Sequence, residues 1–261
     1  MSQPVGASLA FIVMTASVAG LIAASPVAAA DLGSDHSPEA LWRALGGLWE
    51  NVHPISVEKM EAIPQPLTPA YQAKKDEQTR NRAEGREIMT SDNRCIPSGM
   101  PRMMVQASFE FLVRPDSLGI VTSQGVQIRN IWLDGRKHTP VDEVFDSFSG
   151  ESIGHWEGAD LVVDTIGIRP TNEFLYGVQG HYMTTVERFT LTGPDTLRIV
   201  TTVNDPVVFT HPWVYTLNFK RTFKKTVSDM GYCVHALDRE VGQDGVEGFD
   251  LTPPPDPRDQ K

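Results

Sequence analysis

A carboxylate falls on the apolar side of a predicted strand in the C-terminal half of the chain. Glu187 belongs to the run MTTVERFTL and shares the alternation of its apolar residues, so its side chain should face the protein interior. Burial raises the pKa of a carboxyl group unless a cation pairs with it, and Arg129 and Arg188 are the candidate partners. Glu187 is therefore interpreted either as half of a structural ion pair or as a general acid or base.

A histidine occupies a second alternating run. Between Val207 and Phe219 the residues of one parity are apolar or aromatic apart from His211, which would project into an aromatic wall if the strand ran on past Pro212. A histidine titrates near neutral pH and can transfer protons. The alternatives are a hydrogen-bonded histidine in the core, or a bulge at Pro212 that breaks the alternation.

The clearest structural signal is a β-hairpin over residues 152–168, SIGHWEGADLVVDTIGI. Its turn around Gly158 places Trp156 opposite Leu161, and we expect that face to belong to the core. The other face carries Asp164 and is expected either to be solvated, as in many antiparallel sheets, or to line a pocket. In the second case Asp164 would assist the acid and base described above.

Five further residues are candidates for binding a ligand. Trp132, Trp213 and Tyr215 would supply apolar contacts to a small apolar or aromatic molecule. Arg102 or Arg129 would orient the polar end of that molecule.

A nucleophile motif overlaps the start of the hairpin. Residues 150–154, GESIG, match the G-x-S-x-G pattern of hydrolases, with Ser152 as the nucleophile. That pattern acts in a strand-turn-helix context, whereas a hairpin follows Ser152 here. A serine hydrolase is therefore the less favoured interpretation.

No metal or cofactor site is predicted. The seven histidines include no pair at i, i+2 or i, i+4 spacing, and the acidic loop with Asp142, Glu143 and Asp146 lacks the spacing of a calcium loop. A site assembled from distant strands stays open. If the protein is an enzyme, we expect chemistry without a cofactor.

From about residue 108 the sequence alternates with the period of β-strands. Gly, Asp, Asn and Pro separate the runs, and the short connections favour antiparallel pairing of neighbours. The expected fold is mainly β, an antiparallel meander that closes into a lipocalin-like barrel, with a sandwich as the alternative. The predicted strands are 108–114, 118–123, 126–133, 152–157, 160–168, 182–192, 195–204 and 212–221, with a short ninth strand around 230–235.

Two helices are expected before the barrel and packed outside it. Ser37 and Pro38 form the start of the first, whose apolar residues recur at helical spacing as far as Leu48. Thr68 and Pro69 start the second, a highly charged helix whose charges should be solvated.

The chain is expected to form one folded domain after an export signal. Two longer loops, 135–151 and 169–181, would lie at the mouths of the barrel and act as lids. The predicted organisation is a signal peptide over 1–30, a helical and irregular segment over 31–104, the barrel over 105–236 and a disordered Pro-rich tail over 237–261.

The first thirty residues indicate export. They contain no charged side chain and no histidine, are largely apolar, and end in the triplet Ala28 to Ala30, which is typical of a secretory signal peptide cleaved after Ala30. A retained membrane anchor is the alternative. The protein is thus expected to be periplasmic or secreted. Cys95 and Cys233 are expected to form a disulfide there, with two separate buried thiols as the alternative.

The charge balance argues against two classes of partner. A formal net charge of −10 without clusters of Lys and Arg disfavours nucleic acid and anionic membrane surfaces. No segment after the signal peptide is expected to span a bilayer. The expected partner is a small apolar or aromatic molecule.

As a set, several motifs resemble a family of exported bacterial proteins of uncharacterised activity. The resemblance covers nearly all of residues 68–235, implies export and carries no activity with it. The chain departs from the family at Ala159-Asp160, where the family has Asp-Thr, and after Cys233. The motifs are CIPSGMPR over 95–102, IWLDGR over 131–136, the SIGHWEG and LVVDT hairpin, VERF over 186–189, Asp205-Pro206 and Pro212-Trp213.

The leading functional expectation is a cofactor-free lyase or isomerase. Glu187 and His211 would act as acid and base, with help from Asp164. The alternative is a carrier with the same pocket and no chemistry. Hydrolysis through Ser152 and a purely structural role in the cell envelope are less favoured.

Overall fold

The computed structural model describes residues 34–52, 63–86, 90–91, 96–106, 108–123, 127–175, 178–227, 239–241 and 247–249. The predicted signal peptide and the predicted disulfide between Cys95 and Cys233 lie outside the described residues. Within the described residues, no helix combines the length and the apolar character that crossing a bilayer needs.

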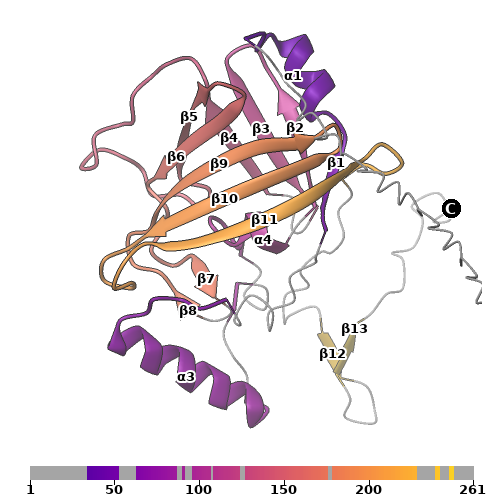
Figure 1. Cartoon of the computed structure of the whole chain (residues 1–261). Helices are drawn as coiled ribbons and strands as arrows, with labels where there is room; N and C mark the ends of the chain where they lie inside the picture. The colour runs from indigo at the N-terminus through magenta and orange to yellow at the C-terminus, as the bar shows by residue number, and fades with distance from the viewer. Residues whose placement is uncertain are drawn as a thin grey trace, which may run out of the picture.

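A closed barrel of nine strands forms the body of the protein (Figure 1). Around the barrel the strands follow the order β1, β11, β10, β9, β6, β5, β4, β3, β2. Their bounds are β1 (Leu48–Asn51), β2 (Phe109–Val113), β3 (Ser117–Thr122), β4 (Ile128–Trp132), β5 (Glu151–Glu157), β6 (Asp160–Ile166), β9 (Thr184–Gly193), β10 (Thr196–Asn204) and β11 (Trp213–Thr222). The prediction of a mainly β, lipocalin-like barrel is confirmed.

The eight main predicted strands are all present, but the strand that closes the barrel differs from the expected one. It is β1, which pairs antiparallel with β11 on one side and with β2 on the other. From the sequence, Leu48 was expected at the end of a helix, and the ninth strand was expected at 230–235, a range outside the described residues. The expected barrel boundary at residue 105 therefore misses β1, because a four-residue strand gives little periodicity to detect.

One pair of neighbouring strands departs from the antiparallel meander. β4 and β5 run parallel, with Ile131 opposite Ser152 and Trp132 opposite Ile153. A parallel pair needs a long connection that carries the chain back to the starting end. The loop 133–150 supplies this connection, and a parallel bridge between Ser147 and Ile168 fixes it.

Side chains alternate between the lumen and the outside along the long strands. In β11 the side chains of Trp213, Tyr215, Leu217 and Phe219 are buried, whereas the residues between them are exposed. The predicted hairpin forms β5 and β6, with Trp156 opposite Leu161 as expected. Because neighbouring strands are in register, inward residues of successive strands form continuous rows across the lumen.

In the described part of the chain, three helices accompany the barrel: α1 (Pro38–Leu45), α3 (Pro69–Ala83) and the short α4 (Met103–Gln106). The predicted starts of α1 and α3 are confirmed, and the Ser37 side chain caps α1 by accepting a hydrogen bond from the Ala40 amide. Figure 1 shows α1 at one end of the barrel and α3 near the other. The sequence analysis missed α4, whose carbonyl at Val105 accepts a hydrogen bond from Asn51 at the end of β1.

Smaller elements occupy two regions predicted to be irregular. In the expected lid 169–181, β7 (Glu173–Leu175) pairs with β8 (Val178–Gln179), and Glu173 and Phe174 are fully buried. In the tail predicted to be disordered, β12 (Arg239–Val241) pairs with β13 (Glu247–Phe249). The Asp-Gly step between these two strands is a hairpin signal that the sequence analysis overlooked.

The guanidinium group of Arg221 holds the end of α1 against the barrel. Nη1 of Arg221 donates to the carbonyl oxygens of Ala44 at 2.8 Å and Arg43 at 3.1 Å, which have no partner within the helix. Nε of Arg221 donates to Asp195 at 3.0 Å. The indole nitrogen of Trp49 also donates to the carbonyl of Leu45. The end of α1 is thus capped by side chains from β1 and β11.

Replacing this guanidinium should weaken the attachment of α1. We expect Arg221→Met to lower the free energy of unfolding by about 2 kcal/mol, because several charge-assisted hydrogen bonds to backbone carbonyls are lost. Arg43→Met is the control, since Arg43 forms only an exposed ion pair with Glu39 and should cost less than about 0.5 kcal/mol. Urea denaturation of both variants measures the difference, and equal losses would contradict the capping role.

Candidate functional site

Polar side chains gather inside the barrel, in two neighbouring rows of the lumen. Each is at most 4% exposed. One row runs from Tyr215 through Thr201 to Glu187, and the next contains Trp213, Thr185, Thr165 and Ser152 in register. We call these side chains and the Arg129 that contacts them the lumen cluster: Arg129, Ser152, Thr165, Thr185, Glu187, Thr201, Trp213 and Tyr215.

Arg129 is the centre of the hydrogen bonding in the lumen cluster. Its Nε donates to Ser152 Oγ at 2.9 Å, and its Nη2 donates to Thr165 Oγ1 at 2.9 Å and pairs with Glu187 Oε2. Both charged side chains are fully buried. The predicted pairing of Glu187 with Arg129 is thus confirmed. Arg188, the other candidate, points outward and pairs with Glu157 and Asp160.

This network also crosses the short parallel seam of the barrel. The parallel pair β4 and β5 is short, with only two registered residue pairs. Arg129 belongs to β4, whereas its partners Ser152, Thr165 and Glu187 belong to β5, β6 and β9. The Arg129 side chain therefore ties β4 to three strands on the far side of that seam.

Six polar atoms of the lumen cluster are buried without a hydrogen-bond partner in the described part of the chain. They include the second terminal nitrogen of Arg129 and the second carboxylate oxygen of Glu187. Buried polar atoms in folded proteins are nearly always hydrogen-bonded, so a group of unpartnered atoms on neighbouring rows of the lumen calls for an additional partner. The six atoms are Arg129 Nη1, Glu187 Oε1, Thr185 Oγ1, Thr201 Oγ1, Trp213 Nε1 and Tyr215 OH.

Tyr215 is a hydrogen-bonding group in this setting. Burial raises the pKa of its phenol above the usual value for tyrosine, and the nearby Glu187 carboxylate raises it further, whereas the Thr201 hydroxyl, near the phenol but outside hydrogen-bond geometry, and the Arg129 charge lower it. The phenol therefore stays protonated at neutral pH. It can donate or accept a hydrogen bond but is poorly suited to release a proton.

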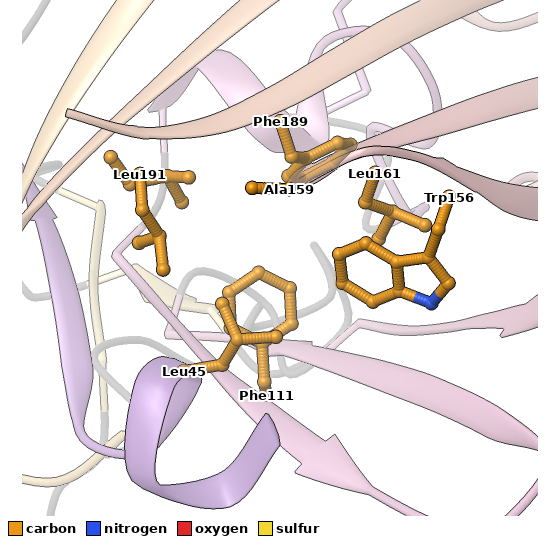
Figure 2. Close-up of a pocket in the computed structure, with 8 residues that line it drawn as sticks. Leu45, Phe111, Trp156, Ala159, Leu161, Phe189 and Leu191 are labelled. Carbon is orange, nitrogen blue, oxygen red and sulfur yellow. The ribbon is translucent and has the colours of Figure 1, made fainter. Parts of the chain in front are cut away.

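An apolar pocket adjoins the lumen cluster on the side of α1 (Figure 2). Phe189 and Leu161 line it, and each lies two residues along its strand from the row that contains Glu187. The pocket is small, with room for about one water molecule. The lining residues are Leu45, Phe111, Trp156, Ala159, Leu161, Phe189, Leu191 and Leu197.

Figure 2 shows that Leu45 reaches this pocket from α1 and lies beside Phe111 of β2. Two glycines, Gly46 and Gly47, connect α1 to β1, and Gly47 has a φ of +94° that favours glycine. A molecule larger than water would fit only if lining side chains moved, and Leu45 is the lining residue that α1 contributes.

Two of the three predicted catalytic residues do not reach Glu187. His211 is exposed in a bend before β11 begins at Trp213, and its ring nitrogen contacts only the neighbouring Thr210 hydroxyl among the described residues. Pro212 breaks the alternation, which was the alternative considered from the sequence. Asp164 faces outward, because it pairs with the exposed Val186 while the preceding Val163 faces the lumen. The predicted assembly of Glu187, His211 and Asp164 is therefore wrong.

The predicted ligand-binding residues divide into three groups. Arg129, Trp213 and Tyr215 belong to the lumen cluster. Trp132 lies on the outer face of β4, where the guanidinium of Arg136 stacks on its ring at 3.7 Å, so its assignment to the pocket is wrong. Arg102 forms a separate buried ion pair.

The ion pair of Arg102 is structural in character. Its Nη1 donates to Glu173 Oε2 at 2.5 Å and to Ser91 Oγ at 2.6 Å. Glu173 lies in β7, outside the barrel sheet. Arg102 thus fixes the segment before α4 to the β7 and β8 hairpin.

The surroundings of Ser152 do not suit a catalytic nucleophile. It lies within β5, and its hydroxyl is bonded to Arg129 and to Thr165, the latter at 2.9 Å. Neither partner is a base that could accept the serine proton. The G-x-S-x-G match therefore has no functional meaning here.

The sequence analysis missed the three threonines of the lumen cluster. Thr165, Thr185 and Thr201 lie at inward positions of strands whose other inward residues are mostly apolar. The parity of these threonines was a usable signal, but threonine is common in strands on either face. Among the described residues, no group of three or more His, Cys, Asp or Glu side chains could hold a metal ion.

Comparison with known proteins gives no assignment. No protein-family model matches the chain, and no curated protein shows a significant match to it. The interpretation of the site therefore depends on its geometry.

Removing one member of the buried pair Arg129–Glu187 should lower the free energy of unfolding strongly, whereas replacing both members should lower it little. We expect Arg129→Met to lower the free energy of unfolding by about 3–5 kcal/mol, because it leaves the Glu187 charge buried without a partner. Adding Glu187→Gln should recover most of that loss. Chemical denaturation of both variants provides the measurement.

Arg188→Met is the matched control for this experiment. Arg188 is adjacent to Glu187 in sequence but is 41% exposed, so its loss should destabilise the protein far less than the loss of Arg129. A double variant no more stable than Arg129→Met alone would show that charge compensation is not the main role of the pair.

Proposed function

We propose that the protein is a binding protein that holds a small, largely apolar or aromatic molecule in the lumen of its barrel. The observation that carries this proposal is the group of six buried polar atoms without partners in the lumen cluster. A ligand that hydrogen-bonds to several of them would remove a desolvation cost of about 1–3 kcal/mol for each atom. Barrels of about this strand number commonly enclose one small ligand.

The ligand would lie with its polar end at the lumen cluster and its apolar part toward α1. The lumen on that side is lined by Phe111, Leu161 and Phe189, which offer only apolar contacts. Because the room there is small, binding would displace Leu45 and move α1 about its two-glycine connection. The predicted role of Trp213 and Tyr215 in contacting the ligand is retained in this proposal.

Binding without chemistry is favoured over the lyase or isomerase reaction. Acid–base catalysis needs a second proton-transfer group beside Glu187, and neither His211 nor Asp164 lies there. Tyr215 does lie in the same row, but its raised pKa makes it a weak acid at neutral pH. The alternative from the sequence, a non-catalytic carrier, therefore becomes the leading one.

The cellular location in this proposal depends on the sequence. The apolar, uncharged stretch at residues 1–30 supports export, and a periplasmic or secreted carrier is consistent with the acidic composition of the remaining chain.

Removing two hydroxyls from the lumen cluster should weaken binding. The probe is naphthylmethanol, a neutral aromatic alcohol, with binding followed by its fluorescence at neutral pH. We expect the double variant Thr201→Val/Tyr215→Phe to bind about fivefold more weakly than the unchanged protein, since the probe hydroxyl loses the one hydrogen bond of about 1 kcal/mol that it can accept from these two side chains.

The control is Thr202→Val, one residue along β10 on its outer face, which should change the dissociation constant by less than about twofold. Equal weakening by both changes would place the ligand elsewhere. Absence of binding to the unchanged protein, with no small molecule retained in native mass spectrometry of protein from its natural host, would refute the binding function.

A further inference from the structure

We infer that the lumen cluster selects an electrically neutral ligand that both donates and accepts hydrogen bonds, as an alcohol or a phenol does. This inference rests on the proposed binding function and names the chemical class of its ligand. It follows from the charge and the hydrogen-bonding character of the buried side chains.

The charges inside the lumen cluster already cancel. Its ionised groups are the Arg129 guanidinium and the Glu187 carboxylate, which pair with each other at full burial. The phenol of Tyr215 stays neutral there. An anion or a cation entering this space would lose its hydration without meeting an uncompensated opposite charge. A neutral molecule avoids that cost.

The other buried charged groups have partners of their own, including Asp205, whose carboxylate accepts hydrogen bonds from the backbone amides of His181, Val207 and Val208. Arg221, near α1, is bonded to Asp195 and to the last carbonyls of the helix. Arg102 is paired with Glu173. Among the described residues, neither group is left to attract a charged ligand into the lumen.

The unpartnered atoms require both kinds of hydrogen bond from the ligand. Arg129 Nη1 and Trp213 Nε1 can only donate, whereas Glu187 Oε1 can only accept. The hydroxyls of Thr185, Thr201 and Tyr215 can do either. A ligand hydroxyl can accept from Arg129 or Trp213 and donate to Glu187.

An ionic group of similar shape can pair with the unpartnered donors or with the unpartnered acceptors of the lumen cluster, but not with both. A carboxylate offers acceptors alone and would bring a second negative charge to Glu187 Oε1. An ammonium group offers donors alone and would face the unpartnered nitrogen of Arg129. The geometry thus disfavours both ions relative to the alcohol.

Three probes of nearly the same shape test this selectivity: naphthylmethanol, naphthoate and naphthylmethylamine, which at pH 7 are neutral, anionic and cationic. Fluorescence titration of the full chain should give a dissociation constant for the alcohol at least about tenfold lower than for either ion. A ranking that places either ion first, or equal binding of all three, would overturn the inference.

Single substitutions in the ion pair should change the ranking in opposite directions. Glu187→Gln leaves the Arg129 charge without a partner, so naphthoate should gain at least about tenfold relative to the alcohol. Arg129→Gln leaves the Glu187 charge without a partner, so naphthylmethylamine should gain instead. The double variant restores neutrality and should again prefer the alcohol. Rankings that both single variants leave unchanged would overturn the inference.

The two proposals fail in different ways. If the unchanged protein binds none of the three probes, the binding function fails and this inference with it. If the probes bind without a preference set by charge, only the inference fails. Should a single variant not fold, as circular dichroism would show, the ranking in the unchanged protein and in the double variant still decides.

Discussion

The buried ion pair between Arg129 and Glu187 is the interaction on which the barrel interior depends. Two full charges in a closed lumen are tolerated only if they compensate each other and find further hydrogen bonds. Ser152 and Thr165 provide those bonds to Arg129. Because these groups come from β4, β5, β6 and β9, the requirement to satisfy one guanidinium also joins the strands across the short parallel seam.

The two ends of the molecule are fixed by similar means. Arg221 holds the last turn of α1 over the apolar end of the lumen, and Arg102 holds the segment before α4 to the β7 and β8 hairpin. The lumen has apolar residues toward α1 and the lumen cluster beside them. In the proposed binding function, this arrangement would give a ligand a polar anchor and an apolar neighbourhood, and α1 would move to admit it.

Much of the fold was predictable because strand periodicity is a local property. The alternation in β9 placed Glu187 inward, and the same reasoning placed Trp213 and Tyr215 inward in β11. The site was predictable only in part. The alternation failed at His211, where Pro212 and a bend end the regular strand, and it could not say that Trp132 faces outward.

The sequence by itself determined the positions of the main strands, the starts of α1 and α3, and which residues of a strand share a face. The backbone geometry of an extended chain imposes these features over a few residues. Only the tertiary structure decided that β1 closes the barrel and that β4 and β5 run parallel. It also decided that Glu187 pairs with Arg129 and not with Arg188. Those outcomes depend on pairing between residues far apart in the chain. No local pattern encodes which strand becomes the neighbour of which.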